Sequence, residues 1–401
     1  MANEIRRKLR TLFMKTEGTD GTANAPADSD AILCEGLDYS GSVEIHEREY
    51  QGIPGAYGGV PGAKNAELSF TAELRPDGSD NTPEIDEVLQ GCGLTVVVGD
   101  LSTTISGTAG GAGSSGPLDV TSAANGTVPE MVMLATAAGT YEVLGPTKVV
   151  DTGATPDDLT TALDAVNGAY NVNGTAVKGM RTYYPKIPPA SNNSMTADIY
   201  KSALGGGADR RDRIIGCRGN VVMNAPGAGS IPKWAFKFMG WNVGRVTTGT
   251  RPAPLYDSAN PKASIGSIFR IDGTYTHGFD FTFDLGMEIA TKKSQYADGG
   301  VYGQLHVKCR PKGSFKIHPA YTSVANFTDW EAGTTHSLLY QIGNTLFGTW
   351  AIYIPRAYWK VVSEPDDNGI EALEVQWEAA EINDASPTAA TLDASFYLGV
   401  G

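Results

Sequence analysis

Residues 67–93 read ELSFTAELRPDGSDNTPEIDEVLQGCG, and this stretch decides which fold to expect. In its first eight residues every second side chain is apolar, which is typical of a strand with one face on a core. The next residues, Arg-Pro-Asp-Gly-Ser-Asp-Asn, are turn formers. The pattern predicts a half-buried strand over Glu67–Leu74 that ends in a turn.

A short helix is predicted directly after this turn. Asn81 or Thr82 can cap it, and Pro83 suits the first helical position, where no N–H is needed. Apolar residues follow at i, i+3, i+4 spacing, acidic residues gather at the amino end, and Gly91 ends the helix. The apolar positions are Ile85, Val88 and Leu89, and the acidic ones are Glu84, Asp86 and Glu87. Because so short a helix is unstable alone, we expect it to lie on a sheet.

The remaining sequence predicts a mainly β protein. The clearest pattern is FDFTFDLGMEIA at 279–290, which we interpret as one strand with Asp280, Asp284 and Glu288 on its polar face. Further strands are predicted at 32–43, 131–137, 140–145, 234–241, 304–310, 349–354, 358–362 and 373–379. This density of strands, separated by Gly, Pro and Asp turns, favours a sandwich or barrel. Residues 157–166 predict a short helix, and residues 1–16 an amphipathic helix or a docking arm.

The amino-acid composition of the chain changes between residues 96 and 180. This segment is rich in Gly, Ser, Thr and Ala and poor in aromatic residues, with GTAGGAGSSG at 107–116. We interpret it as an inserted small domain. The two flanking parts, residues 1–95 and 181–401, then form one discontinuous β domain.

Bulk composition excludes several classes of protein. The net charge of −14 disfavours a protein that grips nucleic acid through its phosphates. No run of eighteen apolar residues occurs, so no membrane-spanning helix is expected. The four cysteines are widely scattered, and we interpret them as reduced core residues.

We find no pattern that predicts catalysis, and we expect neither an enzyme nor a metal or cofactor site. His46-Glu47-Arg48-Glu49-Tyr50 has a tyrosine where a zinc motif needs its second histidine. The glycine-rich run at 107–116 lacks the Lys-Ser/Thr of a phosphate loop. The only basic cluster, ADRRDRIIGCRG at 208–219, contains aspartates and predicts a salt-bridged face.

A long turn-rich segment, residues 44–64, interrupts the strand pattern. It is predicted to be a loop with exposed Tyr50, Ile53 and Tyr57. Loops of this length in compact chains are usually functional or disordered. Its large apolar side chains favour contact with another molecule.

In order along the chain, several motifs resemble the tail tube (major tail) protein of bacteriophages with long, non-contractile tails. Met14–Thr22 (MKTEGTDGT) is similar to that family's Lys-Thr-Glu…Gly-Thr signature, with Asp20 in place of a tyrosine. Glu47–Tyr50 and Pro54-Gly55 take the place of an arginine-containing loop, here without its second arginine. The strand, helix and Cys-Gly stop through Leu94 also resemble the family, as do the segments 214–220, 342–355 and 368–379. The likeness covers residues 11–95 and 182–400.

This resemblance implies a β-sandwich flanked by one short α-helix. It implies hexameric rings that stack into a tube, which houses the tape-measure protein and later conducts DNA. The expected partners are further copies of the chain, the tape-measure protein, and the tail terminator and distal tail proteins. The expected location is the virion tail, assembled in the host cytoplasm and without a membrane. Contacts between subunits or rings are assigned to the loop residues Glu47, Arg48, Tyr50, Ile53 and Tyr57.

A tube that passes DNA must not bind it, and an acidic or neutral wall meets that need. The candidates for an acidic lumen face are Asp280, Asp284 and Glu288 on one strand and Glu374 and Glu378 on another, with the choice between the strands open. The inserted domain is expected on the outer surface of the tube. Two alternatives remain: a carbohydrate-binding or adhesin β protein of a virion, and a hydrolase whose paired carboxylates lie in the acid-rich tail.

Overall fold

A computed structural model describes eighteen parts of the chain. They are residues 5–48, 57–73, 75, 82–99, 102–104, 118–120, 130–137, 140–150, 157–161, 176–185, 194–203, 209–227, 229–246, 251–256, 260–293, 301–318, 325–380 and 394–401. Within them almost all regular structure is antiparallel strand, so the predicted mainly β fold is confirmed. The described residues contain two α-helices rather than the single one expected.

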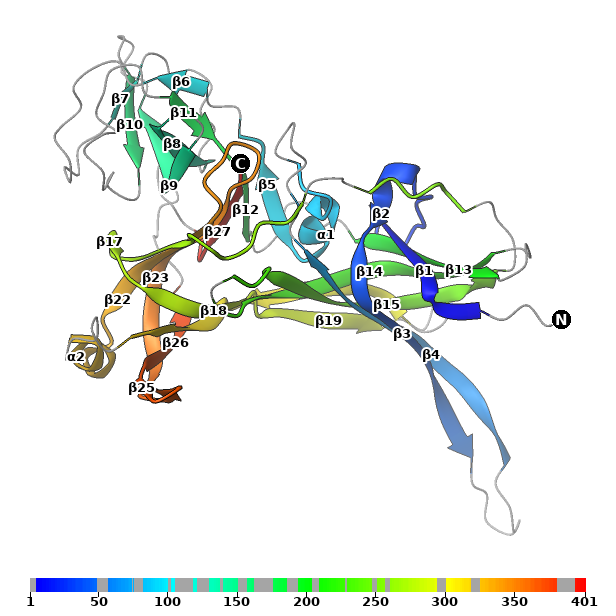
Figure 1. Ribbon diagram of the computed structural model, residues 1–401. Coiled ribbons are helices and arrows are strands. Elements are labelled where there is room, and N and C mark those ends of the chain that lie inside the picture. The colour runs from blue at the N-terminus through cyan, green and yellow to red at the C-terminus, as the bar shows by residue number, and fades with distance from the viewer. Residues whose placement is uncertain are drawn as a thin grey trace.

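Seventeen strands belong to one hydrogen-bonded sheet, the body of the molecule (Figure 1). Its first half comprises β1 (Ile5–Thr16), β2 (Ala31–Ile32), β3 (Cys34–Arg48), β4 (Tyr57–Glu73), β5 (Leu94–Val97), β12 (Arg181–Pro185), β13 (Met195–Ala203), β14 (Arg210–Ala225) and β15 (Lys233–Val246). Its second half comprises β16 (Ile268–Ile271), β17 (Thr274–Tyr275), β18 (Gly278–Asp284), β21 (Lys312–Ile317), β22 (Thr335–Ile342), β23 (Trp350–Ser363), β26 (Leu373–Ala379) and β27 (Tyr397–Val400).

Three smaller sheets complete the molecule. The two-stranded ones are β19 (Met287–Lys293) with β20 (Val301–Cys309) and β24 (Asp366–Asp367) with β25 (Ile370–Glu371). The third has six strands in the order β6-β11-β8-β9-β10-β7 and forms a separate lobe, at the upper left in Figure 1. Its strands are β6 (Ser102–Thr104), β7 (Leu118–Val120), β8 (Glu130–Ala137), β9 (Thr140–Val150), β10 (Asp157–Thr161) and β11 (Ala176–Gly179). All six come from the segment interpreted above as an insertion.

The strand predicted from residues 67–74 is the second half of β4. Leu68, Phe70 and Ala72 are buried and Glu67 is exposed, as the alternation requires. Phe70 stacks on Phe236 of the neighbouring β15, with 5.1 Å between ring centroids. The core therefore begins at the stretch from which the fold was predicted, while Leu74 lies outside the described residues.

The helix α1 (Asp86–Gly91) lies on β1, β5 and β14. Its apolar stripe of Ile85, Val88 and Leu89 is buried as predicted. Its predicted start was wrong, because Pro83 to Ile85 form a turn, closed by a bond from Asp86 N to Pro83 O of 2.9 Å. The left-handed residue that ends it is Gly93, with φ 86°, rather than Gly91.

Residues 279–290 do not form one strand, contrary to the prediction. Gly286, with φ 60°, breaks the segment into β18 and β19. A Cβ at Gly286 would lie 2.1 Å from the carbonyl oxygen of Arg310, so no larger residue fits there. β19 and β20 then lie across β4, β14 and β15 as a second layer of the core.

Two helix predictions fail because helical spacing of apolar residues occurs here in strands. Residues 5–16 form β1, with Leu12, Phe13 and Met14 all buried. The start of the predicted helix at 157–166 is β10, and its remainder lies outside the described residues. Conversely, the surface helix α2 (Ala325–Ala332), which packs on β23, was not predicted.

Candidate assembly interface

The most exposed feature of the body is a β-hairpin formed by the distal parts of β3 and β4. We call residues 40–48 with 57–65 the arm; it extends away from the body at the lower right of Figure 1. Every residue of β3 from Ser40 to His46 is exposed, and β3 pairs with β4 alone among the described strands. Nine residues of strand give the arm a reach of about 30 Å. The predicted loop at 44–64 is thus largely a hairpin.

The arm carries apolar side chains that the described parts of the subunit leave exposed. Ile45 is 64% exposed, Val43 47% and Val60 44%. Of the predicted contact residues, Glu47, Arg48 and Tyr57 lie at the outer end of the arm, where Arg48 pairs with Tyr57 in register. Tyr50 and Ile53 lie outside the described residues. The arm therefore offers an apolar surface whose natural partner is another molecule.

The Lys-Thr-Glu motif lies at a buried junction of the body. The Glu17 carboxylate is 4% exposed and accepts hydrogen bonds from Gly21 N (2.7 Å), Gly216 N (2.9 Å), Thr196 Oγ1 (2.9 Å) and Ser194 Oγ. Gly216 has φ 61°, and the ring of Trp241 covers both Gly21 and Gly216. One carboxylate thereby fixes the N-terminal turn to β13 and β14.

Glu17→Ala should lower the free energy of unfolding by about 3 kcal/mol or more, because several buried donors lose their acceptor at 1–3 kcal/mol each. The matched control is Glu35→Ala, which removes the exposed partner of Lys233 (2.6 Å) and should cost less than about 1 kcal/mol. Urea unfolding of both variants is the measurement. Equal effects would show that Glu17 is not a structural anchor.

The acidic residues at the start of α1 bind two strands and the residue that precedes a third. Asp86 makes a bidentate pair with Arg181 of β12 (2.7 and 2.9 Å) and also accepts from Tyr183. Glu87 accepts from Thr16 N of β1 at 2.8 Å, and Glu84 accepts from Leu33 N, which directly precedes β3. From the sequence, these carboxylates were expected to interact favourably with the helix dipole. Their hydrogen bonds and ion pair to other elements were not predicted.

The predicted acidic lumen residues do not lie on the two alternative faces expected from the sequence. Asp280 and Asp284 on β18 and Glu374 and Glu378 on β26 share one face of one sheet, with β21 between them. Glu288 lies on β19, in the other layer. Lysines of β21 and β23 bind these carboxylates: Lys316–Asp280 at 3.1 Å, Lys312–Asp284 at 3.7 Å and Lys360–Glu378 at 3.0 Å. The two strands treated as alternatives are thus parts of one surface, which is charge-paired rather than acidic.

Electrostatics on this face follow from the pairing. The hydrogen bond to Asp280 raises the pKa of Lys316, and the bond to Glu378 raises the pKa of Lys360. Partial burial acts to raise the pKa of Glu378, but the bonds from Lys360 and Tyr358 outweigh it and the pKa is lowered. All three groups therefore stay charged at neutral pH.

His306 of β20 is the histidine most perturbed by the fold. It is 3% exposed, and its Nε2 lies 3.2 Å from the carbonyl oxygen of Gly219. Burial and the nearby Arg218 lower its pKa from 6.5 to about 4. The imidazole is therefore neutral in the fold and packs β20 against β14.

Stability should fall as the pH drops from about 6.5 to about 4, because the unfolded chain binds a proton there that the folded chain does not. The loss attributable to His306 approaches about 3 kcal/mol at the lower limit. His306→Gln should remove that part of the pH dependence, measured by urea unfolding at pH 7, 5 and 4. Parallel pH profiles for the two proteins would contradict the assignment.

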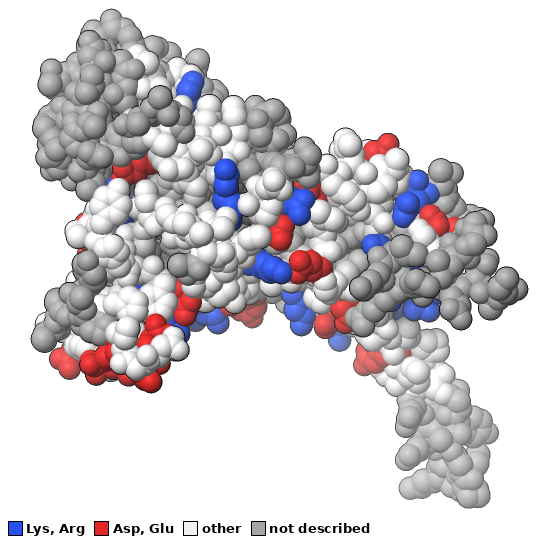
Figure 2. All heavy atoms as spheres, in the orientation of Figure 1, with Lys and Arg blue, Asp and Glu red and all other residues white. Residues whose placement is uncertain are grey.

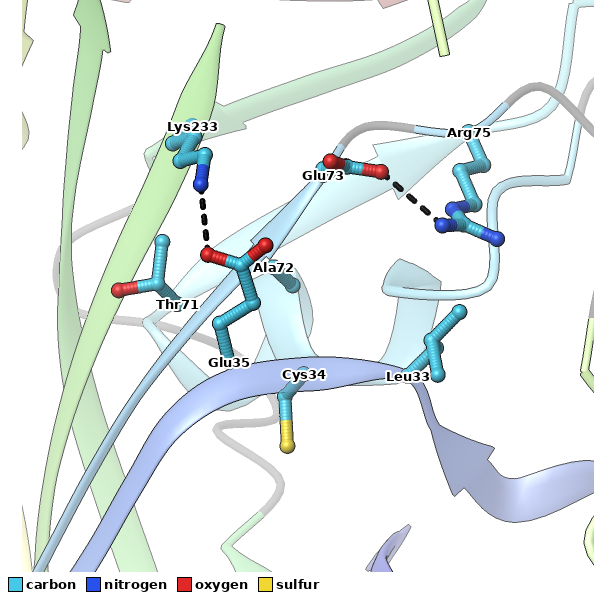
Figure 3. Close-up of a pocket in the computed structure, with 8 residues that line it drawn as sticks. All are labelled: Leu33, Cys34, Glu35, Thr71, Ala72, Glu73, Arg75 and Lys233. Carbon is cyan, nitrogen blue, oxygen red and sulfur yellow. Dashed lines mark hydrogen bonds and ion pairs between the residues drawn. The ribbon is translucent and has the colours of Figure 1, made fainter. Parts of the chain in front are cut away.

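A cavity of about 210 Å³ lies between β3, β4 and β15, at the end of the β3–β4 pair that is opposite the arm (Figure 3). Its charged groups bind one another, since Lys233 pairs with Glu35 and Arg75 with Glu73 (3.0 Å). Burial, with a smaller effect from Glu84, raises the pKa of Cys34 to about 12, so this thiol is a poor nucleophile at neutral pH. The cavity thus offers neither an unpaired charge nor an activated thiol.

The six-stranded lobe is joined to the body by a buried seam. Arg270 of β16, fully buried, forms an ion pair with Glu142 of β9, and Tyr275 Oη donates to the same carboxylate at 3.0 Å. Val143 N donates to Gln341 Oε1 of β22 at 2.9 Å. One apolar cluster spans both sides, with Met131, Met133 and Val143 from the lobe and Leu339, Ala351, Tyr353 and Tyr397 from the body. The lobe is therefore packed against the body through a shared core.

The buried basic cluster of β13 and β14 is a salt-bridged face, as predicted. Asp198 binds Arg213 through both carboxylate oxygens (2.6 Å each), and Asp212 binds Lys201. Both aspartates are fully buried. The arginines of this cluster therefore bind carboxylates of the same chain and are not available for phosphate.

Sequence comparisons leave the function open. No protein-family model matches the chain, and no curated protein matches it. Within the described residues, no three His, Cys, Asp or Glu side chains come together as a metal site would require. No described helix is long and apolar enough to cross a membrane.

Proposed function

We propose that the chain is a tail tube subunit of a long-tailed bacteriophage, which forms hexameric rings that stack into the tube. The observation that carries the proposal is the arm, whose Val43, Ile45 and Val60 are exposed among the described residues. A monomer gains nothing from such a surface, whereas a ring or a stack of rings buries it.

The family motifs support the same proposal by their position. Glu17 of the Lys-Thr-Glu signature anchors the N-terminal turn, and the helix with its Cys-Gly stop is bound to β1 and β12. The arginine-containing loop of the resemblance coincides with the outer end of the arm. In this proposal, contacts with the tape-measure, terminator and distal tail proteins, and residence in the virion tail, follow from the tube.

The adhesin alternative needs an exposed aromatic platform. Of the six tryptophans, all in the described parts, Trp330 is exposed at 39%, Trp241 is half-buried and the other four are buried. Trp330 Nε1 donates to Lys360 O (3.1 Å), which fixes its ring on the surface of the body. This distribution favours the tube over carbohydrate binding.

Electron microscopy of the purified protein tests the proposal, because it requires rings or filaments of uniform diameter. A soluble monomer alone is compatible with a subunit that waits for an initiator. Mass spectrometry of tails from purified virions supplies the decisive comparison, and absence of the chain from those tails would refute the proposal.

A further inference from the structure

Eight consecutive strands of the body present one continuous polar face. Their order is β3, β4, β15, β14, β18, β21, β26 and β23, each hydrogen-bonded to the next. One face carries the core aromatics Phe236, Phe283 and Trp377. The opposite face carries the charged residues described above, and we call it the ladder face.

The sign of charge on the ladder face alternates from strand to strand over β18, β21, β26 and β23, and acidic, basic and amide strands also lie next to one another in the other half. β3 and β4 are acidic, β15 basic, β14 amide, β18 acidic, β21 basic, β26 acidic and β23 basic. The residues, in that order, are Glu35 and Glu67, Lys233 and Lys237, Asn220 and Asn224, Asp280 and Asp284, Lys312 and Lys316, Glu374 and Glu378, and Lys360. Red and blue spheres alternate along the lower edge of the body in Figure 2.

Nearly every charge on this face has a partner on the next strand. Lys237–Glu67 at 3.5 Å and Lys233–Glu35 join β15 to β4 and β3. The side-chain amide of Asn220 on β14 donates a hydrogen bond to Asp284 on β18 at 3.0 Å, so the polar contacts continue across β14. Lys316 faces Asp280 on one side and Glu374, its register partner, on the other. The six carboxylates and five ammonium groups named here nearly cancel, and of the two further carboxylates that register places on this face, Asp38 and Glu73, the latter binds Arg75.

The acidic excess of the chain lies elsewhere. Glu364, Asp366, Asp367 and Glu371 gather at β24 and β25, at the lower left of Figure 2. This cluster offers a control at the border of the ladder face, because Asp366 and Glu371 are exposed, whereas its Asp367 is half-buried and helps to raise the pKa of Lys316.

We infer that the ladder face lines the lumen and lets duplex DNA pass because its charges cancel locally; this rests on the proposed function. Over β18, β21, β26 and β23 opposite charges alternate with a period of two strands, about 10 Å, so their fields cancel within a few ångströms of the surface, and on the other strands the ion pairs of Lys233 and Lys237 act in the same way. Proteins bind phosphates through cations that displace the counterions of DNA. A lysine that is already paired with a carboxylate is not available for this. DNA separated from this wall by a water layer is neither held nor repelled.

The test removes the partners and leaves the lysines. Asp284→Asn with Glu378→Gln frees Lys312 and Lys360, and Asp280→Asn with Glu374→Gln independently frees Lys316. The control, Asp366→Asn with Glu371→Gln, removes the same charge from the acidic cluster. For each variant, tubes are imaged by electron microscopy, and DNA release from particles carrying it is followed with a fluorescent dye at several salt concentrations.

Both ladder variants should form tubes and release DNA at least about tenfold more slowly at low salt, with recovery at high salt. The control should behave as the wild type. Normal release by a ladder variant that is present in the tube, or equal slowing by the control, overturns the inference but leaves the tube proposal intact. Absence of the wild-type chain from the tails of purified virions overturns both.

Discussion

Ile45→Lys with Val60→Lys is expected to abolish tube assembly while the melting temperature of the subunit changes by less than about 2 °C. Both side chains lie on the arm, where they are 64% and 44% exposed and contribute little to the fold of the subunit. In an assembled tube the same side chains would be buried against a neighbour. Two charges placed there without partners would cost several kcal/mol per contact, repeated in every subunit.

The matched control is Ile265→Lys, since Ile265 is 73% exposed on the body rather than on the arm. It should assemble normally, which separates an effect of the arm from a general effect of added charge. Electron microscopy counts the tubes, and calorimetry gives the melting temperature. A large fall in melting temperature for the arm variant would mean that the arm belongs to the core of the subunit.

Glu142→Ala should destabilise the protein by about 3–5 kcal/mol, because it leaves the Arg270 guanidinium buried without its carboxylate. Burial lowers the pKa of Arg270, although Tyr275 acts to raise it. The lowered pKa reflects the free-energy cost of keeping this charge buried. Glu142→Leu with Arg270→Met should restore most of the stability, since an apolar pair of similar volume needs no partner.

Urea unfolding measures the effect, with Lys360→Ala plus Glu378→Ala as the control on an exposed pair. That control should cost less than about 1 kcal/mol. If Glu142→Ala is equally mild, the seam does not hold the lobe. The seam also predicts that replacing the whole lobe with a linker exposes the body's part of the shared core, so a subunit without the lobe should aggregate.

Period-2 patterns were the most informative part of the sequence. Alternation at 67–73 and 281–285 predicted buried faces correctly, because every second side chain of a strand meets the same core, whereas Phe279 was wrongly placed, since a bulge at Asp280 brings it beside Lys316. The break at Gly286 was missed, since alternation continues through it by coincidence. What decides the break is the close approach of the Arg310 carbonyl, which no local pattern reveals.

The charged surface shows the limit of sequence reasoning most clearly. Asp280, Asp284 and Glu378 were recognised as outward-facing, but their lysine partners lie on other strands, 18 to 36 residues away in the chain. Whether a carboxylate is paired depends on strand order and register, which local spacing does not give. The acidic wall expected from the sequence is therefore a paired one in the structure.

The cross-links of α1 have a consequence for the order of events on the ribosome. Its partners Thr16 and Leu33 precede it, whereas Arg181 follows it by 95 residues. The helix is too short to persist alone, and the strands it covers include β14, which is synthesised after residue 209. We therefore expect the first half of the nascent chain to wait without its core, its strand edges open to chaperones, until β12 to β15 have emerged.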